Sequence, residues 1–192
     1  MKLLREYIRE LLTESIDPKI MSMIDRADAA NYHVDVKSTR VQIFDGTKNE
    51  IAIVSWKRPE ENYDGPCLGS AIVVRTEASE GFGPLTYDIA IEATGGLTSD
   101  RMLVSDDAEN VWNYYMKNRP DVETAQLDSL GPEGDLGLPH ITPEKADDDC
   151  MQIPAYYSKK DRWHDSSLSK KVSKVGTPVM DELRKRGMLY EK

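Results

Sequence analysis

The chain has little cysteine, histidine or phenylalanine, and it has no long apolar run. Its two cysteines, Cys67 and Cys150, stand 83 positions apart in a chain of 192 residues. A scaffold of several disulfides is therefore excluded, and two reduced thiols are expected. The three histidines lie far apart, without C-x-x-C or H-x-x-x-H spacing, so no dedicated transition-metal site is expected. No apolar stretch approaches the ~18 residues of a membrane span.

The charge of the chain is acidic overall and unevenly distributed. The formal net charge of -9 argues against a general nucleic-acid binder. Residues 121–150 carry nine acidic side chains against one basic, whereas residues 158–192 carry ten basic against five acidic. The acidic stretch also holds glycines and prolines and little apolar periodicity, which predicts a long surface loop. Two interpretations stay open: a linker that contacts the basic segment, or a lid over a site.

The first residues predict a short amphipathic helix over 1–14. Apolar side chains recur there at helical spacing, and acidic residues alternate with basic ones to give no net charge. This pattern is unlike a secretory signal, and it favours only weak adsorption to a membrane. Asp17 and Pro18 are typical of the start of a second helix.

The middle of the chain predicts an alternation of helices and short strands. The apolar spacing and the turn residues predict a helix over 19–30, a hairpin of 41–43 with 51–56 around Asp45-Gly46, a buried strand over 67–76, a helix over 85–94, a strand over 102–104, a helix over 106–118 capped by Ser105, and a closing helix over 179–188.

A glycine-rich loop, Glu80-Gly81-Phe82-Gly83-Pro84, joins the predicted buried strand to the helix that follows. Glycine lets a backbone approach a ligand closely, and free N–H groups at a helix N-terminus can hold a phosphate. A tight turn between strand and helix, without any ligand, is the alternative interpretation.

Residues 67–118 resemble the central half of the GNAT N-acyltransferase superfamily, through this strand, loop, helix, strand and helix order and through Ala78-Ser79-Glu80-Gly81-Phe82-Gly83. The resemblance implies an α/β fold, a GNAT-like central sheet flanked by helices. It also implies acyl-coenzyme A as the cofactor, beside the strand at Val73 and Val74. The amides of Gly81, Phe82 and Gly83 would hold its pyrophosphate.

The sequence departs from this family at residues that matter for catalysis. The Gln or Arg that opens the family's loop is Ala78 here, and Glu80 brings a carboxylate close to the expected pyrophosphate. The tyrosine that protonates the departing thiolate aligns with Trp112, which has no transferable proton. Tyr115 is the nearest substitute as catalytic acid, and an aromatic residue on the apolar face of its helix is the alternative.

The N-terminal residues Met1 to Glu10 resemble the capsid-targeting peptides of internal head proteins in large tailed phages. The prohead protease of such phages cuts after a Leu/Ile-x-Glu triplet, which Ile8-Arg9-Glu10 and Leu12-Thr13-Glu14 both match. The resemblance implies capsid or scaffold proteins as partners of residues 1–14. A helix that docks on its own domain is the alternative.

Other candidate sites have plainer explanations. Cys150 follows three aspartates, which disfavour a thiolate, so a buried structural cysteine is expected there and at Cys67. Residues Trp163-His164-Asp165, near several basic side chains, predict either a small anion or nucleic-acid patch or a solvated basic surface.

Four segments and two functions are therefore expected. The segments are a helix over 1–15, a GNAT-like core over 16–120, an acidic loop or lid over 121–157, and a basic segment over 158–192 that packs on the core. The first function is a phage-encoded acyltransferase of the host cytoplasm that acts on an unknown amine. The second is a non-catalytic virion protein of the same fold.

Overall fold

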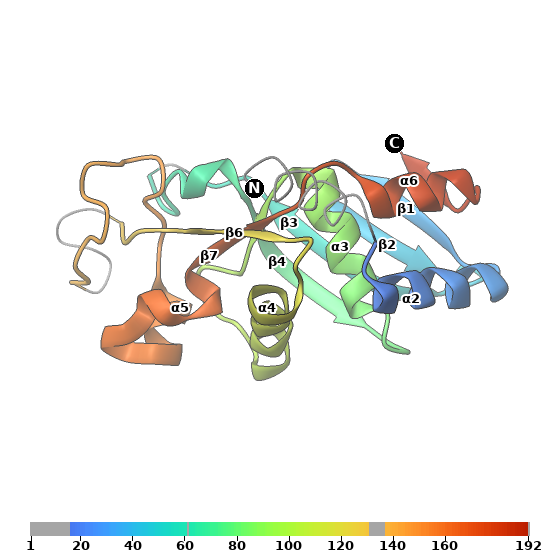
Figure 1. Ribbon diagram of the computed structural model, residues 1–192, viewed down its shortest axis with the longest axis horizontal. Helices are drawn as coiled ribbons and strands as arrows, with labels where there is room; N and C mark the ends of the chain where they lie inside the picture. The colour runs from blue at the N-terminus through green and yellow to red at the C-terminus, as the bar shows by residue number, and fades with distance from the viewer. Residues whose placement is uncertain (1–15, 61, 131–136, 192) are drawn as a thin grey trace, which may run out of the picture.

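An eight-stranded mixed sheet runs through the part of the chain that the computed structural model describes, residues 16–60, 62–130 and 137–191 (Figure 1). The strand order is β6-β7-β5-β4-β3-β2-β1-β8. The strands are β1 (His33–Lys37), β2 (Arg40–Phe44), β3 (Glu50–Lys57), β4 (Ala71–Ala78), β5 (Leu97–Thr98), β6 (Glu123–Gln126), β7 (Lys170–Ser173) and β8 (Leu189–Glu191). The α-helices are α2 (Pro18–Ala29), α3 (Gly83–Thr94), α4 (Asp106–Asn118), α5 (Ile153–Lys159) and α6 (Pro178–Lys185). A mixed α/β fold is thus confirmed.

The predicted hairpin is confirmed as β2 and β3, which pair antiparallel with Val41 opposite Val54. Its turn is closed by Asp45, whose carboxylate accepts N–H groups from Thr47 and Asn49 at 2.8 Å each. These donors stabilise the ionised carboxylate. The strand β1, which precedes the hairpin and pairs antiparallel with β2, is absent from the sequence-based prediction.

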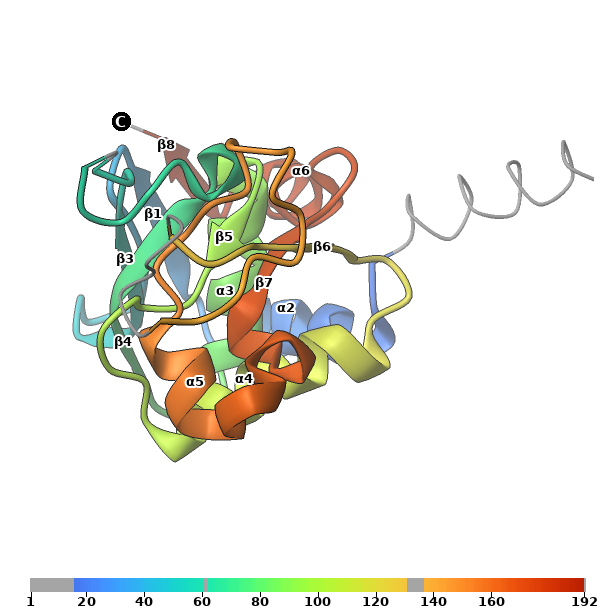
Figure 2. The same ribbon diagram turned by 90° about the vertical axis from the view of Figure 1, so that its left-hand side faces the viewer.

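One face of the sheet carries the main hydrophobic core. Alternate side chains of β1, β2 and β3 are fully buried against helices α2, α3 and α6, which lie together on this face (Figure 2). Helix α3 is the central one, because its residues are buried at every position from Leu85 to Glu92, the polar ones included. Asp17 caps α2 and Gly95, in the left-handed conformation, ends α3, both as expected.

Strands β4 and β5 are parallel neighbours that stay paired over only two residues. Ala71 lies opposite Leu97 and Ile72 opposite Thr98, whereas β3 stays paired with β4 as far as Ala78. A register shift between Ser55 and Trp56 marks a bulge in this β3/β4 pairing. Within the described ranges, no strand pairs with this edge of β4 from Val73 onward.

The strand predicted over 102–104 is wrong, and the strand after α3 is β5. Asp100 Oδ1 accepts the N–H groups of Met102 and Leu103 at 2.7 and 2.9 Å, which closes a turn there. Leu103 is 83% exposed, so this apolar residue lies on the surface and not in a buried strand. The first residues of the predicted 67–76 strand form instead a 3₁₀ turn, Cys67–Gly69.

The acidic stretch is not free of regular structure. Residues 123–126 form β6, which pairs antiparallel with β7 of the basic segment, with Thr124 opposite Val172. β7 in turn lies beside β5. The strand was invisible in the sequence because its four residues carry no apolar alternation and depend on a partner far along the chain.

The two cysteines are fully buried and joined by a disulfide. The expected burial is confirmed, and the expectation of reduced thiols is wrong. Backbone hydrogen bonds bring the two segments together: Cys67 N–H donates to Asp149 O at 2.9 Å, and Leu68 N–H donates to Asp147 O at 2.7 Å. The sequence spacing of 83 residues holds no sign of this contact.

The helix predicted over 1–14 lies outside the described residues. Across the described ranges, no helix combines the length and the apolar composition that crossing a bilayer requires.

Candidate functional site

A groove opens where β4 and β5 part, between the free edge of β4 and helix α4. We name it the β4 groove, and its volume is about 140 Å³. Four consecutive β4 residues from Val73 to Thr76 form one wall. The other lining residues come from α3, from the β5–α4 connection and from α4: Tyr87, Asp100, Leu103, Val104, Ser105, Ala108 and Trp112. Of the predicted cofactor-binding residues, Val73 and Val74 therefore lie in this groove.

Three ionisable side chains line the β4 groove: Arg75, Tyr87 and Asp100. The hydroxyls of Tyr87 and Thr76 lie 3.0 Å apart in a hydrogen bond. Burial raises the pKa of Tyr87, against a smaller opposing effect of Thr76, so its phenol stays protonated at neutral pH. Asp100 is held by the two backbone N–H groups of its own turn. A proton donor and a carboxylate thus share one groove.

Trp112 also lines the β4 groove, at the position where the family resemblance aligns a tyrosine. Its ring meets the Tyr87 ring edge to face, with 5.6 Å between the centroids. The tryptophan thus supports the tyrosine, which enters the groove from α3 and not from α4. Sequence reasoning missed Tyr87 because it sits on a helix that is buried almost all round.

The glycine loop forms a tight turn into α3. Glu80 and Gly81 have positive φ angles of 55° and 77°. Phe82 N–H donates to Ser79 O at 3.1 Å, and the Phe82 side chain is buried. The Phe82 amide is therefore already used, which removes it from the three amides expected to hold a pyrophosphate. No described residue supplies a side-chain cap to α3, so the Gly83 amide in its first turn is uncapped, whereas Gly81 precedes the N-cap residue Phe82.

Two side chains flank this loop, one from helix α2 and one from the residue just before β1. Arg26 donates to the Glu80 carbonyl at 2.9 Å, and its guanidinium lies 4.9 Å from the centre of the Phe82 ring. Tyr32 donates its hydroxyl to the Glu80 carboxylate at 2.9 Å, a bond that raises the pKa of Tyr32. A hollow of about 330 Å³ lies between these residues. Arg26 thus brings a positive charge to this loop, and no sequence motif pointed to it.

Tyr115, the predicted catalytic acid, is buried beneath α3. Its hydroxyl lies 2.5 Å from Asp88 Oδ1 and 3.0 Å from Pro84 O. Burial, together with the Asp88 charge, raises the pKa of Tyr115 well above 10. Tyr115 is not among the residues that line the β4 groove. Its role as an acid stays a prediction, and its contacts favour a part in holding α4 against α3.

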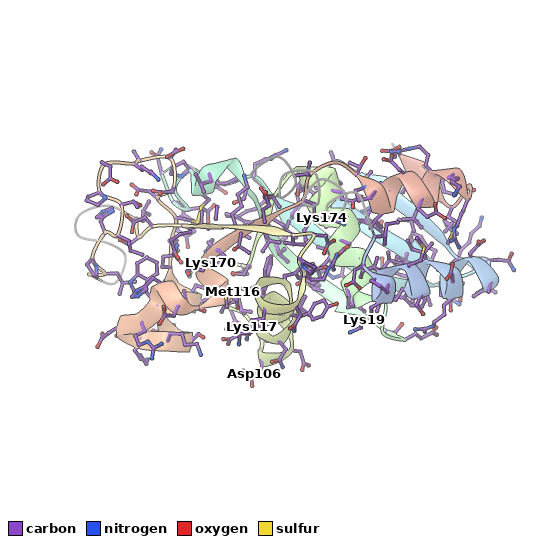
Figure 3. The ribbon with its side chains drawn as sticks, in the orientation of Figure 1. Lys19, Asp106, Met116, Lys117, Lys170 and Lys174 are labelled. Carbon is purple, nitrogen blue, oxygen red and sulfur yellow. A yellow bond between two sulfur atoms is a disulfide. The ribbon has the colours of Figure 1, made fainter. Side chains whose placement is uncertain are left out.

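Asp88 belongs to a buried charge network that joins α3, the end of α4 and the basic C-terminal segment. Arg119 binds two carboxylates, Asp88 at 2.7 and 2.8 Å and Asp121 at 2.7 and 2.8 Å. Lys174 binds Asp88 at 3.1 Å and Glu92 at 2.7 Å. Lys174 comes from the segment after β7 and lies near the centre of the molecule in Figure 3. The network therefore fastens the C-terminal segment to the core.

The network sets the ionisation of its members. Burial alone lowers the pKa of Arg119, but its hydrogen bonds with Asp121 and Asp88 outweigh this effect and raise the pKa. Burial likewise opposes the charge of Asp121, yet the bond to Arg119 lowers the pKa of this carboxyl. Glu92 differs, because burial outweighs the attraction of Lys174 and raises the pKa of the Glu92 carboxyl. Each buried charge of the network therefore depends on its oppositely charged partners for its stability.

Asp128, His140 and Asp149 form the cluster that most resembles a metal site among the described residues. His140 Nδ1 lies 3.2 Å from Asp128 and 3.7 Å from Asp149. The Asp128 carboxylate already accepts backbone N–H groups from Ser129, Ile141 and Thr142, which lower its pKa against the effect of burial. Because these hydrogen bonds occupy its lone pairs, Asp128 fits the role of a metal ligand poorly. It fits better as a residue that holds the acidic stretch together.

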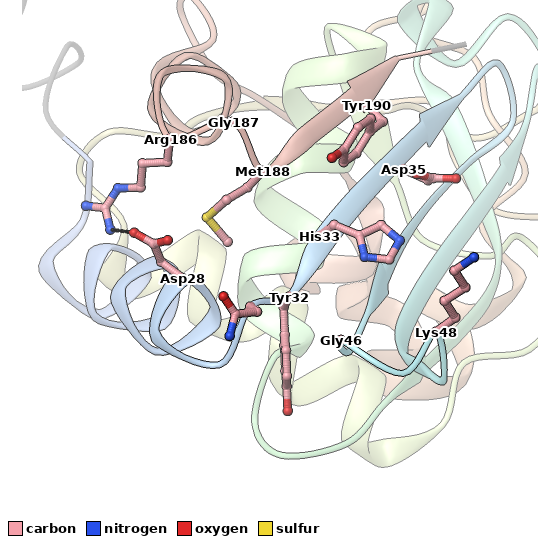
Figure 4. A pocket seen from close by; sticks show the side chains of 11 residues that line it. Asp28, Tyr32, His33, Asp35, Gly46, Lys48, Arg186, Gly187, Met188 and Tyr190 are labelled. Carbon is pink, nitrogen blue, oxygen red and sulfur yellow. Dashed lines mark hydrogen bonds and ion pairs between the residues drawn. The ribbon is translucent and has the colours of Figure 1, made fainter.

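A hollow of about 650 Å³ lies beside β1 and the edge strand β8 (Figure 4). His33 and Tyr190 lie across these strands with ring centres 5.8 Å apart. Arg186 lines its side and forms an ion pair with Asp28 at 3.2 Å. The hollow mixes acidic, basic and aromatic groups on an open surface, and it lies far along the sheet order from β4 and β5. It does not add to the β4 groove.

Comparison with protein-family models, with curated proteins and with solved structures finds no match to this chain.

Proposed function

We propose that this protein is a GNAT-like N-acyltransferase that moves an acyl group from acyl-coenzyme A to an amine. The parting of β4 and β5 after two paired residues carries the proposal. It leaves backbone groups of β4 open beside a groove, and the same strand continues into the glycine loop at the N-terminus of α3. The resemblance of residues 67–118 implies a thioester in such a position.

The residues of the β4 groove divide the chemistry between them. The amine nitrogen attacks the thioester carbonyl, the C–N bond forms, and the C–S bond breaks. The acceptor reacts as the neutral amine, after its ammonium form has released one proton to water. Tyr87 gives its proton to the departing thiolate, and Asp100 takes the proton that the attacking nitrogen loses. The open backbone of Val73 and Val74 orients the thioester. Trp112, at the position of the family's acid, holds the Tyr87 ring.

The glycine loop supplies the phosphate contacts in this proposal. The amides of Gly81 and Gly83 point to the pyrophosphate, and Arg26 adds the positive charge that Ala78 does not. Tyr32 holds the Glu80 carboxylate by a hydrogen bond of 2.9 Å, which limits its repulsion of the ligand.

Two tyrosine variants test the assignment of the acid. Turnover is followed as coenzyme A release with a panel of primary amines, and binding of acetyl-coenzyme A is measured by calorimetry. We expect Tyr87→Phe to lower kcat by about 10²-fold or more and to leave the binding of acetyl-coenzyme A within threefold. Tyr115→Phe should lower thermal stability and leave kcat within about threefold. The reverse pattern, in folded proteins, would return the acid role to Tyr115.

A second candidate function, a non-catalytic phage virion or internal head protein, is favoured by the disulfide between Cys67 and Cys150. Disulfides persist on virions and outside cells, whereas thiols stay reduced in a bacterial cytoplasm. Residues 1–14 would carry the fold to capsid or scaffold proteins. Mass spectrometry of purified virions tests it. Finding neither the full chain nor one that starts at Leu11 or Ser15 would count against this function.

A further inference from the structure

A second groove adjoins the β4 groove, between the start of α4 and α5. We name it the α4–α5 groove, and its volume is about 220 Å³. Leu103 and Val104 line both grooves, so that the two hollows share one wall. Its remaining lining residues are Met102, Asp106, Glu109, Pro154, Tyr157, Ser158 and Leu168. Helices α4 and α5 lie side by side in both ribbon views (Figures 1 and 2).

The wall of this groove is apolar and unusually exposed. Met102 is 51% exposed, Leu103 83% and Tyr157 65%, which makes them three of the most exposed large apolar side chains in the described ranges. Met102 also accepts a hydrogen bond from the Tyr63 hydroxyl at 3.4 Å, so the patch continues past the groove. Grouped apolar exposure of this kind marks binding surfaces more often than scattered exposure does.

The charge of the groove has one sign. Its lining includes the carboxylates of Asp106 and Glu109 and, among the described residues, no basic side chain. Glu109 accepts a hydrogen bond from Ser158 at 2.6 Å across the groove, which fixes its position. Asp106 lies at the free end of α4, where Figure 3 labels it. The nearby Lys160 ammonium is 5.0 Å from the Tyr157 ring and outside the lining.

We propose that the α4–α5 groove binds the acceptor of the reaction, a primary amine that carries an apolar group. The inference rests on the proposed acyl transfer and names the acceptor class for it. The apolar group lies on Met102, Leu103 and Tyr157, and the two carboxylates attract the ammonium. The shared wall at Leu103 and Val104 then leads the amine toward Asp100 in the β4 groove.

The size of the groove limits the acceptor. A volume of 220 Å³ lies below the roughly 300–1,000 Å³ of pockets for drug-sized molecules. A small aralkylamine, or the amine-bearing end of a larger molecule, fits such a space. The acids of this helix end also stabilise α4 through its dipole, and that role alone requires no apolar neighbours.

The test uses 2-phenylethylamine as the probe and calorimetry or ligand-observed NMR as the readout. Two further compounds separate its features: ethylamine keeps the ammonium without the apolar group, and 2-phenylethanol keeps the ring without the charge. We expect 2-phenylethylamine to bind at least fivefold more tightly than either compound. Equal binding of all three, or no binding of any, would overturn the proposal.

Matched variants test whether the probe binds in the α4–α5 groove. Asp106→Asn and Asp107→Asn remove the same charge from the same helix end, but only Asp106 lines the groove. We expect Asp106→Asn to weaken binding about two- to fivefold and Asp107→Asn to leave it within 1.5-fold. Leu103→Ser, at an exposed position that costs the fold little, should weaken binding further. Equal effects of the two aspartate variants would overturn the proposal in favour of a diffuse charge effect.

The failure of this inference can be told apart from failure of the proposed function. Binding of acetyl-coenzyme A without binding of the amine would overturn the acceptor groove alone. Binding of the amine without acetyl-coenzyme A would keep the groove as an amine site and overturn acyl transfer. Self-association that rises with protein concentration and is abolished by Leu103→Ser would assign the apolar patch to a second copy of the chain and overturn the acceptor role.

Discussion

Reduction of the disulfide should strongly destabilise the protein, and the size of the effect follows from its position. The bond joins residues 83 apart, in the 3₁₀ turn before β4 and at the end of the acidic stretch. For a loop of about this length, the loss of chain entropy in the unfolded state corresponds to about 4.5 kcal/mol at 25 °C. That is a large share of the 5–15 kcal/mol typical of a domain.

Urea unfolding, followed by tryptophan fluorescence, measures this effect in one chain with and without a reductant. Trp112 and Trp163 are buried and report on the core. At a slope of about 2 kcal/mol/M, the midpoint should fall by roughly 2 M on reduction. A Cys67→Ala/Cys150→Ala variant should behave like the reduced protein and should not respond to reductant.

Two results would refute this reasoning. Mass spectrometry after alkylation would find two free thiols in protein prepared without reductant if the bond were absent. A midpoint shift under 0.5 M, with the bond present, would mean that the hydrogen bonds of Cys67 and Leu68 to the acidic stretch hold the loop without it.

Three further changes have expected outcomes. Arg119→Met should cost about 3–5 kcal/mol in urea unfolding, because it removes one of the two cations, Arg119 and Lys174, that the buried carboxylates of Asp88 and Asp121 share; a loss under 1 kcal/mol would contradict the network. Ser105→Ala should cost about 1 kcal/mol, since its side chain caps α4 at Ala108 N–H; thermal melts that match the wild type would argue against that cap. Hydrogen bonds from Asn49 and Thr47 lower the pKa of Asp45 to about 2, below its value when unfolded. The contribution of Asp45 to stability should be complete above about pH 5 and fade as the pH falls toward 2. Asp45→Asn should remove this pH dependence, and NMR titration of the Asp45 carboxyl can check its pKa.

Helices α2, α3, α4 and α6 could be predicted from the sequence, because caps and apolar spacing are local signals, whereas the short α5 was missed because the expected acidic loop or lid over 121–157 covered most of it. Asp17, Ser105 and Gly95 each mark a helix end that the structure has. Strands were predicted less well. β2 and β3 have β-branched runs and a turn between them, whereas β6 and β8 are short and form only because β7 and β1 supply partners from distant parts of the chain.

The residues of the candidate site also differ in how far the sequence alone could predict them. Val73 and Val74 were expected beside the cofactor from the family resemblance, and the structure has them in the β4 groove, while their binding role stays a prediction. Tyr87, Asp100 and Arg26 were missed, because each reaches the site only through the packing of a different element. The disulfide was missed for the same reason, since contacts between residues 83 positions apart leave no trace in local patterns.

Calorimetric titration with acetyl-coenzyme A, beside Gly83→Asp and Gly83→Asn, tests the central proposal most directly. A Cβ at Gly83 would lie 3.5 Å from the Ala78 Cβ, an ordinary contact, so both variants should fold. They differ in one charge at the N-terminus of α3. We expect saturable binding by the wild type, a loss of at least tenfold in Gly83→Asp, and a smaller loss in Gly83→Asn. No binding at millimolar concentration, or equal binding by all three proteins, would contradict a coenzyme A site at this loop.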